Sequence, residues 1–153
     1  MPDITKILVP TDGSTYALKA AGLAGEFARR FEASVRVIHV QDESVVVAAA
    51  WNAVSVSQDD TTTVREALEQ RATDEEVADT LVALGDLPTA PEIAQRWGHP
   101  VEQICHDAET ANVDLIVLGS HGKSALARAV LGSVCNGVVN AAPCAVTVVR
   151  EPR

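Results

Sequence analysis

Val113-Asp-Leu-Ile-Val-Leu-Gly-Ser-His-Gly122 joins a short apolar run to two glycines and is the strongest indication of the fold in this sequence. A continuous apolar run of this length is typical of a buried parallel strand, and glycines at its carboxyl end let the backbone turn sharply and approach a ligand. The same stretch begins the pattern Gly-x-x-Gly-x9-Gly-Ser, formed by Gly119, Gly122, Gly132 and Ser133. Free N–H groups in such a loop, followed by a helix N-terminus, favour an anion. We therefore expect a phosphate-binding loop after this strand.

Two commoner phosphate loops do not fit this pattern. A P-loop needs a glycine five residues before Gly122, and that position is Val117, inside the expected strand. A dinucleotide fingerprint needs Gly-x-Gly-x-x-Gly after the first strand, where the chain has Thr11-Asp-Gly-Ser14. The glycines could instead serve only a turn and a close helix contact. The presence of all four residues of the pattern directly after a strand favours a binding site over that alternative.

Length and composition exclude several classes of protein. The 153 residues are the size of one domain, which we assign to residues 1–153. Aromatic residues make up only 3% and the net charge is −9, which argues against binding to nucleic acid or to an anionic membrane. The sequence has no apolar stretch of membrane-spanning length and no signal peptide, so we expect a cytoplasmic protein. Cys105, Cys135 and Cys144 lack metal-ligand spacing, and we expect them to be small buried residues rather than a metal site.

The chain alternates expected strands with expected helices. The strands are Lys6–Pro10, Ser34–Val40, Pro91–Trp97, Val113–Leu118 and Cys144–Val149. The first expected helix is capped by Ser14, and its apolar face includes Ala17, Leu18, Ala21, Leu23, Ala24 and Phe27. The second runs from Thr63 to Leu84, with core candidates Val64, Leu68, Ala72, Val77, Leu81 and Leu84. The third begins at Pro100, and the fourth starts near Gly132-Ser133. Between the second strand and the second helix, 41–63 is expected to be a long loop with room for a short helix.

This alternation predicts one α/β domain with a parallel sheet and helices on both faces. The polar strand Pro91–Trp97 should lie at an edge. With the strand order 3-2-1-4-5, the order reverses between the first and fourth strands, and ligands bind at the carboxyl ends there. Asp12 follows the first strand and the glycine loop follows the fourth. We therefore expect them to face each other across one crevice.

Five segments in order resemble the universal stress protein family. They are Val9-Pro-Thr-Asp-Gly-Ser14, Ile38-His-Val40, Asp114-Leu-Ile-Val-Leu-Gly-Ser-His-Gly122, Leu131-Gly-Ser-Val134 and Ala142-Pro-Cys-Ala-Val-Thr-Val-Val149. The match spans nearly the whole chain, while 41–100 matches only in general plan. The complete glycine pattern is similar to that of the members that bind ATP. The resemblance implies a Rossmann-like fold of the adenine nucleotide alpha hydrolase type.

The resemblance also implies a set of site residues. The adenine and ribose would lie against Pro10, Thr11 and Asp12, with the main chain of Val40 at the adenine edge and with Leu118 and Gly119 beneath the ribose. The phosphates would lie beside Ser120, His121, Gly122 and Lys123. They would accept hydrogen bonds from N–H and hydroxyl groups of Gly132, Ser133, Val134 and Cys135. The implied cofactor is ATP, or AMP or ADP, with Mg or Mn bound through the phosphates. A homodimer through Cys144–Val149 is implied as well.

Three functions remain open at this point. The first is a non-catalytic ATP-binding regulator of a stress response that acts on an unknown protein partner. The second is an enzyme that hydrolyses ATP or transfers its adenylyl group. No Ser-His-Asp set, Walker B carboxylate or arginine finger can be located in the sequence, so we assign no catalytic residues. The third is a scaffold that binds no nucleotide, which the intact glycine pattern disfavours.

Overall fold

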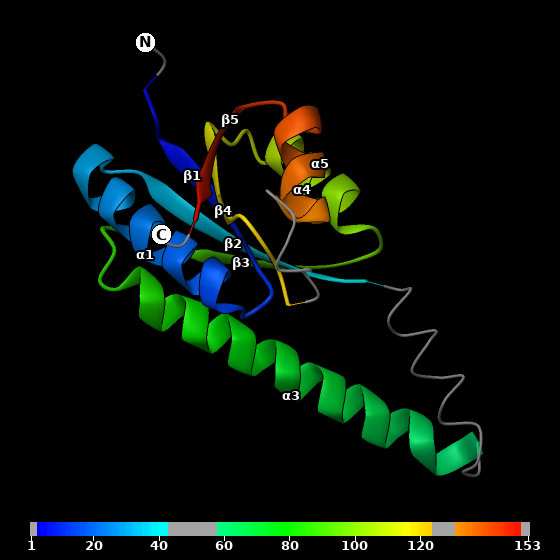
Figure 1. Ribbon diagram of the computed structural model, residues 1–153. Coiled ribbons are helices and arrows are strands. Elements are labelled where there is room, and N and C mark those ends of the chain that lie inside the picture. The colour runs from blue at the N-terminus through cyan, green and yellow to red at the C-terminus, as the bar shows by residue number, and fades with distance from the viewer. Residues whose placement is uncertain (1–2, 43–57, 124–130, 151–153) are drawn as a thin grey trace.

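The computed structural model describes residues 3–42, 58–123 and 131–150, with the backbone alone for 58–69. Five strands form one parallel sheet in the order β3-β2-β1-β4-β5 (Figure 1). The strands are β1 (Lys6–Thr11), β2 (Ser34–Gln41), β3 (Glu92–Trp97), β4 (Leu115–Gly119) and β5 (Ala145–Val149), and the helices are α1 (Thr15–Phe31), α3 (Gln58–Leu84), α4 (Pro100–Thr110) and α5 (Ser133–Ala141). The predicted fold class and strand order are confirmed, with β3 at one edge.

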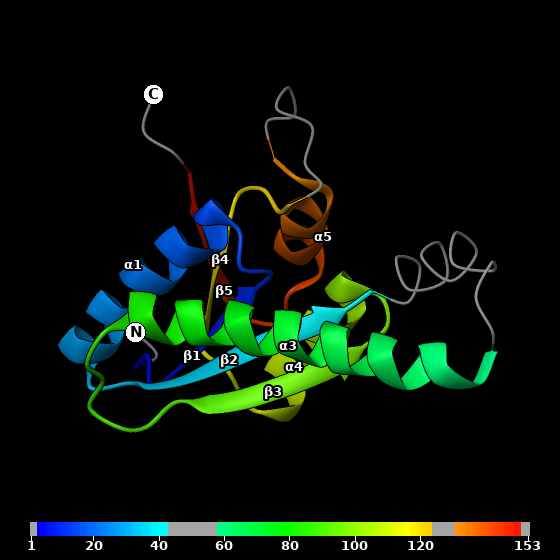
Figure 2. The same cartoon turned by 90° about the horizontal axis from the view of Figure 1, so that it is seen from below.

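Helices cover both faces of the sheet, as Figures 1 and 2 show. Side chains alternate along each strand, so Ile7 and Val9 of β1 pack with α1 and α3, while Leu8 between them packs toward α4 and α5. The two resulting apolar cores lie on opposite sides of the same five strands. Because the strands are parallel, the carboxyl ends of β1, β2 and β4 lie together at one end of the sheet, and the site described below lies at this end.

α1 begins and packs as its sequence predicts. The Ser14 hydroxyl accepts a hydrogen bond from the Ala17 N–H at 3.2 Å, which confirms the predicted N-cap. The fully buried face consists of small residues, chiefly alanines. Of the predicted apolar face, Leu18 and Leu23 are only half-buried, because a helix packed closely on a sheet has room for small side chains beneath it and pushes larger ones to the flanks.

The second predicted helix is correct in its end but wrong in its start. α3 begins at Gln58, so Thr63 is not its cap and 58–63 is not loop, whereas 43–57 lies outside the described residues. Asp59 and Asp60 occupy its first turn, where negative charge favours a helix N-terminus. Gly85, with a φ of 71°, ends it as predicted.

The buried face of α3 also differs from the prediction. Ala72 is exposed, and Thr73 and Thr80 are buried beside the predicted Val77 and Leu84. Two of these inward positions are therefore polar, and the Thr80 hydroxyl meets that of Thr11 at 2.7 Å, which satisfies both groups. Of the other three core candidates, Leu81 is partly buried against the core, and the side chains of Val64 and Leu68 lie outside the described residues.

A buried carboxylate fixes α4 to the outer strands. Asp107 is 1% exposed and accepts hydrogen bonds from Arg36 Nε at 2.6 Å and Nη2 at 2.9 Å, and from Arg96 Nη2 at 3.0 Å. Burial opposes ionisation of this carboxyl, but the two guanidinium groups outweigh it and hold its pKa below the ordinary value. Asp107 thus joins α4 to β2 and β3 and positions the wall of the pocket described next.

Candidate functional site

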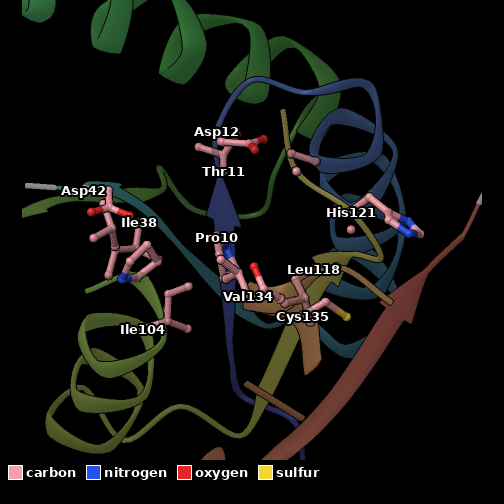
Figure 3. Close-up of a pocket in the computed structure, with 17 residues that line it drawn as sticks. Pro10, Thr11, Asp12, Ile38, Asp42, Ile104, Leu118, His121, Val134 and Cys135 are labelled. Carbon is pink, nitrogen blue, oxygen red and sulfur yellow. The ribbon is translucent and has the colours of Figure 1, made fainter. Parts of the chain in front are cut away.

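A cavity of about 260 Å³ opens at the carboxyl ends of β1, β2 and β4, beside the N-termini of α4 and α5 (Figure 3). All of the predicted site residues except Ser120 and Lys123 line it, namely Pro10, Thr11, Asp12, Val40, Leu118, Gly119, His121, Gly122, Gly132, Ser133, Val134 and Cys135. The lining also includes five residues that the sequence analysis did not select, namely Ala17, Ile38, Asp42, Pro100 and Ile104. The cavity lies at the predicted point where the strand order reverses.

One wall of the cavity is apolar. Ile38 and Leu118 lie on the face of the sheet that packs toward α4 and α5, and Ile104 of α4 closes the wall from the other side. Pro10 lies between them in Figure 3. An apolar wall of this kind suits a flat ring that must be held without many hydrogen bonds. Ile38 and Ile104 could have been found from strand alternation and helix period once the order of strands was known.

The opposite end of the cavity is the N-terminus of α5. Gly132 is its N-cap and has no side chain to cap it, so the first-turn N–H groups of Ser133, Val134 and Cys135 are left for a ligand. The Gly132 N–H itself donates to the Ser120 carbonyl at 2.7 Å. A Cβ at Gly132 would lie 3.2 Å from that carbonyl oxygen and from the His121 Cα, so the loop and the helix end touch through backbone. This end of the cavity favours negative charge.

Asp12 connects the two loops that the sequence analysis expects to face each other. Its Oδ1 accepts from the Ser14 N–H at 2.9 Å, and its Oδ2 accepts from the Lys123 N–H at 2.9 Å. A Cβ at Gly122 would lie 2.7 Å from Asp12 Oδ2, so a side chain at this position would have to displace the carboxylate. The crevice between β1 and β4 is therefore closed at its rim by a side chain from one loop bound to the backbone of the other.

Thr11 and Lys123 direct their polar groups away from the cavity. The Thr11 hydroxyl is bound to Thr80 of α3, on the other face of the sheet. The Lys123 ammonium forms an ion pair with Glu76 of α3, and Glu76 also meets His39 Nε2 at 2.7 Å. Glu76 was missed by the sequence analysis, because nothing in a helix pattern shows that an exposed-looking carboxylate will reach a loop 47 residues away.

His121 and Ser120 brace the loop. Ser120 is 1% exposed, its N–H donates to the Val149 carbonyl at 2.8 Å, and its hydroxyl meets His121 Nδ1 at 2.9 Å. The His121 ring lies 5.2 Å from that of Tyr16 and in Figure 3 points away from the residues around Pro10. His121 therefore lines the cavity near its backbone, while its ring packs against Tyr16 of α1 at an interplanar angle of 48°.

The cavity offers no ready-made metal site. Across the described ranges, no three His, Cys, Asp or Glu side chains are grouped so that they could hold an ion. Of the three cysteines that were predicted to be buried, Cys135 in the first turn of α5 is buried, and burial raises the pKa of its thiol, whereas Cys105 and Cys144 are only half-buried. Nor is any described helix long and apolar enough to cross a membrane.

Comparison with known proteins shows the family of this chain. A sequence model of the universal stress protein family matches residues 3–150. The chain belongs to the universal stress protein family. It is 33% identical over 162 residues to the universal stress protein MJ0531 of Methanocaldococcus jannaschii, an alignment that covers 97% of this chain and 83% of that protein.

Solved structures of the family share the whole fold. The structure of MJ0577, also from Methanocaldococcus jannaschii, superposes with a TM-score of 0.77 at 27% identity over 99% of both chains. Universal stress protein UspA from Lactobacillus plantarum superposes with a TM-score of 0.76 at 26% identity over 98% of this chain and 100% of that one. Two more distant structures with the same fold, at 23% and 19% identity, are complexes with cAMP and with dAMP.

Proposed function

We propose that this universal stress protein binds ATP, or another adenine nucleotide, with Mg or Mn bound through the phosphates, and acts as a nucleotide-dependent regulator. The observation that carries the proposal is that one cavity joins an apolar wall to the uncapped N-terminus of α5. A nucleotide has the same two ends, a flat base and a charged phosphate. That complexes of related proteins with cAMP and dAMP exist supports the choice of an adenine nucleotide.

In the proposed complex the base lies between Ile38 and Ile104, where the main chain of Val40 reaches its edge. Leu118 and Gly119 lie under the ribose. The phosphates lie at the first turn of α5, where Ser133, Val134 and Cys135 offer N–H groups to negative charge. The phosphate oxygens supply most of the ligands for the cation, because the described residues present no acidic cluster for it.

The same contacts favour binding over catalysis. Hydrolysis needs a group that positions and deprotonates an attacking water. Both oxygens of Asp12 accept backbone N–H groups, and the His121 ring is engaged with Ser120 and Tyr16. We therefore favour a regulator, in which nucleotide occupancy changes the surface around the glycine loop that a protein partner reads, and keep an ATP hydrolase or adenylyl transferase as the second candidate.

The proposal is tested by titration calorimetry of nucleotide-free protein with ATP and magnesium. Gly122→Ala is the informative variant, because its Cβ must displace the Asp12 carboxylate and open the rim of the crevice. We expect at least about a tenfold loss of affinity, or about 1.4 kcal/mol. Gly22→Ala is the matched control, since Gly22 lies on α1 with ordinary contact distances and away from the cavity. Wild-type protein that binds no adenine nucleotide would leave the scaffold as the better explanation.

A further inference from the structure

An ion pair lies just outside the cavity, on the side of the glycine loop that faces α3. Lys123 follows Gly122, which lines the cavity, and its backbone N–H is bound to Asp12 Oδ2 at 2.9 Å. Its ammonium is bound to Glu76 of α3. The backbone of Lys123 is thus fixed at the rim of the cavity while its charge is held away from it.

Glu76 is the rigid partner of this pair. Its Cβ and Cγ occupy the space where Gly13 would carry a side chain, since a Cβ on Gly13 would lie 2.5 Å from Glu76 Cγ. Gly13 has a φ of 71°, which glycine adopts without strain. His39 Nε2 holds the other carboxylate oxygen at 2.7 Å. The Glu76 side chain is 18% exposed and that of Lys123 is 57% exposed, so the ammonium is the group that is free to swing.

Hydrogen bonds also fix the backbone of Glu76 to the end of β1. The Thr80 hydroxyl donates its single proton to the Glu76 carbonyl at 2.7 Å, so at its 2.7 Å contact with Thr11 it must accept. Thr11 in turn accepts from the Gly13 N–H at 3.2 Å. The carboxylate is therefore presented to Lys123 by a chain of bonds that runs from the loop after β1 to α3.

We propose that Lys123 exchanges Glu76 for the outer phosphates of a bound nucleotide, so that this pair makes the site sensitive to the number of phosphates. The inference rests on the proposed function. A single phosphate at the first turn of α5 is satisfied by N–H groups there and leaves the ion pair intact. A diphosphate or triphosphate extends past Gly122 toward the Lys123 backbone and offers its ammonium a second acceptor.

Glu76 then acts as a competitor, and it determines specificity without touching the ligand. A polyphosphate can bind the Lys123 ammonium only if the ion pair between Lys123 and Glu76 breaks, whereas a monophosphate binds without breaking it. After the exchange the Glu76 carboxylate keeps its contact with His39, so the change is confined to the ammonium. Removing the Glu76 charge should therefore strengthen the binding of ATP and leave the binding of AMP alone.

The experiment is calorimetric titration of AMP, ADP and ATP, each with magnesium, into nucleotide-free wild type, Glu76→Gln, Lys123→Ala and the double variant. Gln keeps the side-chain stem against Gly13 and an oxygen for His39. Glu75→Gln is the matched control, because it removes the same charge from an exposed position one residue along α3. Thermal unfolding of each variant verifies that the fold is retained.

We expect Glu76→Gln to bind ATP about three to ten times more tightly, with AMP affinity unchanged within twofold. Lys123→Ala should weaken ATP about tenfold and leave AMP unchanged, and the double variant should match Lys123→Ala. If wild type binds both nucleotides but Glu76→Gln changes neither, or changes both equally, the exchange is refuted while the proposed function stands. If wild type binds neither nucleotide, both are refuted.

Discussion

Three aspartates determine how the loops and helices meet, and each does so through partners distant in the sequence. Asp12 binds the glycine loop, Asp107 binds Arg36 and Arg96, and Asp114 binds the segment that leads into β1. The position of Asp12 opposite the loop could be predicted, because strand order alone places it there. The partners of Asp107 and Asp114 could not be predicted, because a shift of one residue between neighbouring elements changes which side chains meet.

Asp114 gives a prediction about acid stability. Its Oδ2 accepts from the Thr5 N–H at 2.9 Å, the Thr5 hydroxyl at 2.8 Å and the Lys6 N–H at 2.9 Å, and these bonds lower the pKa of the carboxyl in the folded protein. A lowered folded-state pKa stabilises the fold above the unfolded-state pKa of about 3.9, and this stabilisation is lost as the pH falls through the folded value.

We therefore expect Asp114→Asn to lower the free energy of unfolding by roughly 1 to 2 kcal/mol near pH 7 and by progressively less below about pH 4. Urea unfolding from pH 7 to pH 2.5 measures this difference. Asp79→Asn, which removes an exposed carboxylate of α3, should give a small difference with no such trend. A deficit for Asp114→Asn that stays constant to the lowest pH would contradict the explanation.

At the scale of elements, β5 lies at the edge of the sheet and, among the strands that the structure describes, pairs only with β4. The Val149 carbonyl accepts from the Ser120 N–H, so the backbone groups of Val149 and Thr147 point toward β4, and those of Val148 between them point to the open edge. An apolar open edge without charge is a liability unless another strand covers it. We predict a two-fold homodimer in which this edge pairs with its symmetry mate.

The alternation of backbone direction gives this prediction a matched pair of variants. Val148→Pro removes an N–H from the open edge and should yield a folded monomer, while Thr147→Pro removes one from the ladder with β4 and should lower stability instead. Analytical ultracentrifugation at micromolar concentration, with circular dichroism of each variant, separates the two effects. A wild-type protein that sediments as a monomer would contradict the predicted dimer.

Elements were predictable where one kind of signal dominated. The apolar run of β4 and the polar edge strand β3 were identified correctly from periodicity and composition. The start of α3 was not, because a run of Asp and Thr is typical of both a cap and a first turn. Thr73 and Thr80 are typical of surface positions in the sequence, but both are buried. The burial of Thr80 depends on hydroxyl partners that the sequence does not show, namely Thr11 of β1 and the Glu76 carbonyl.

At the scale of the whole molecule, the site forms between two layers of the structure and belongs to no single segment. The apolar wall comes from strand positions that face α4 and α5, and the ion pair at Lys123 comes from the opposite layer through α3. Strand order predicted that Asp12 and the glycine loop meet at the cavity, and the family resemblance implied the other predicted lining residues. Strand order could not reveal Glu76 and His39, because they act across the sheet from the cavity.

The arrangement leads to a last prediction, that ATP stabilises this protein without being turned over. N–H groups at α5 hold ground-state phosphates, but a faster reaction requires groups that act more strongly on the transition state. Asp12 and His121, the side chains nearest to such a role, are both engaged in structural contacts. ATP at 100 times its dissociation constant should then raise the free energy of unfolding by about 2.7 kcal/mol.

Thermal unfolding with increasing ATP and magnesium measures the stabilisation, and release of phosphate and AMP under the same conditions measures turnover. Gly122→Ala serves as the control for contaminating ATPases, since a tenfold weaker affinity should reduce the stabilisation to about 1.4 kcal/mol at the same ATP concentration, while contaminating enzymes should give the same background release. Multiple turnovers in wild type that are absent from Gly122→Ala would favour the enzyme instead. Because Asp12 closes the crevice against the loop, such activity would also require the Lys123 backbone to leave that carboxylate, and replacing Asp12 would be the first step in tracing it.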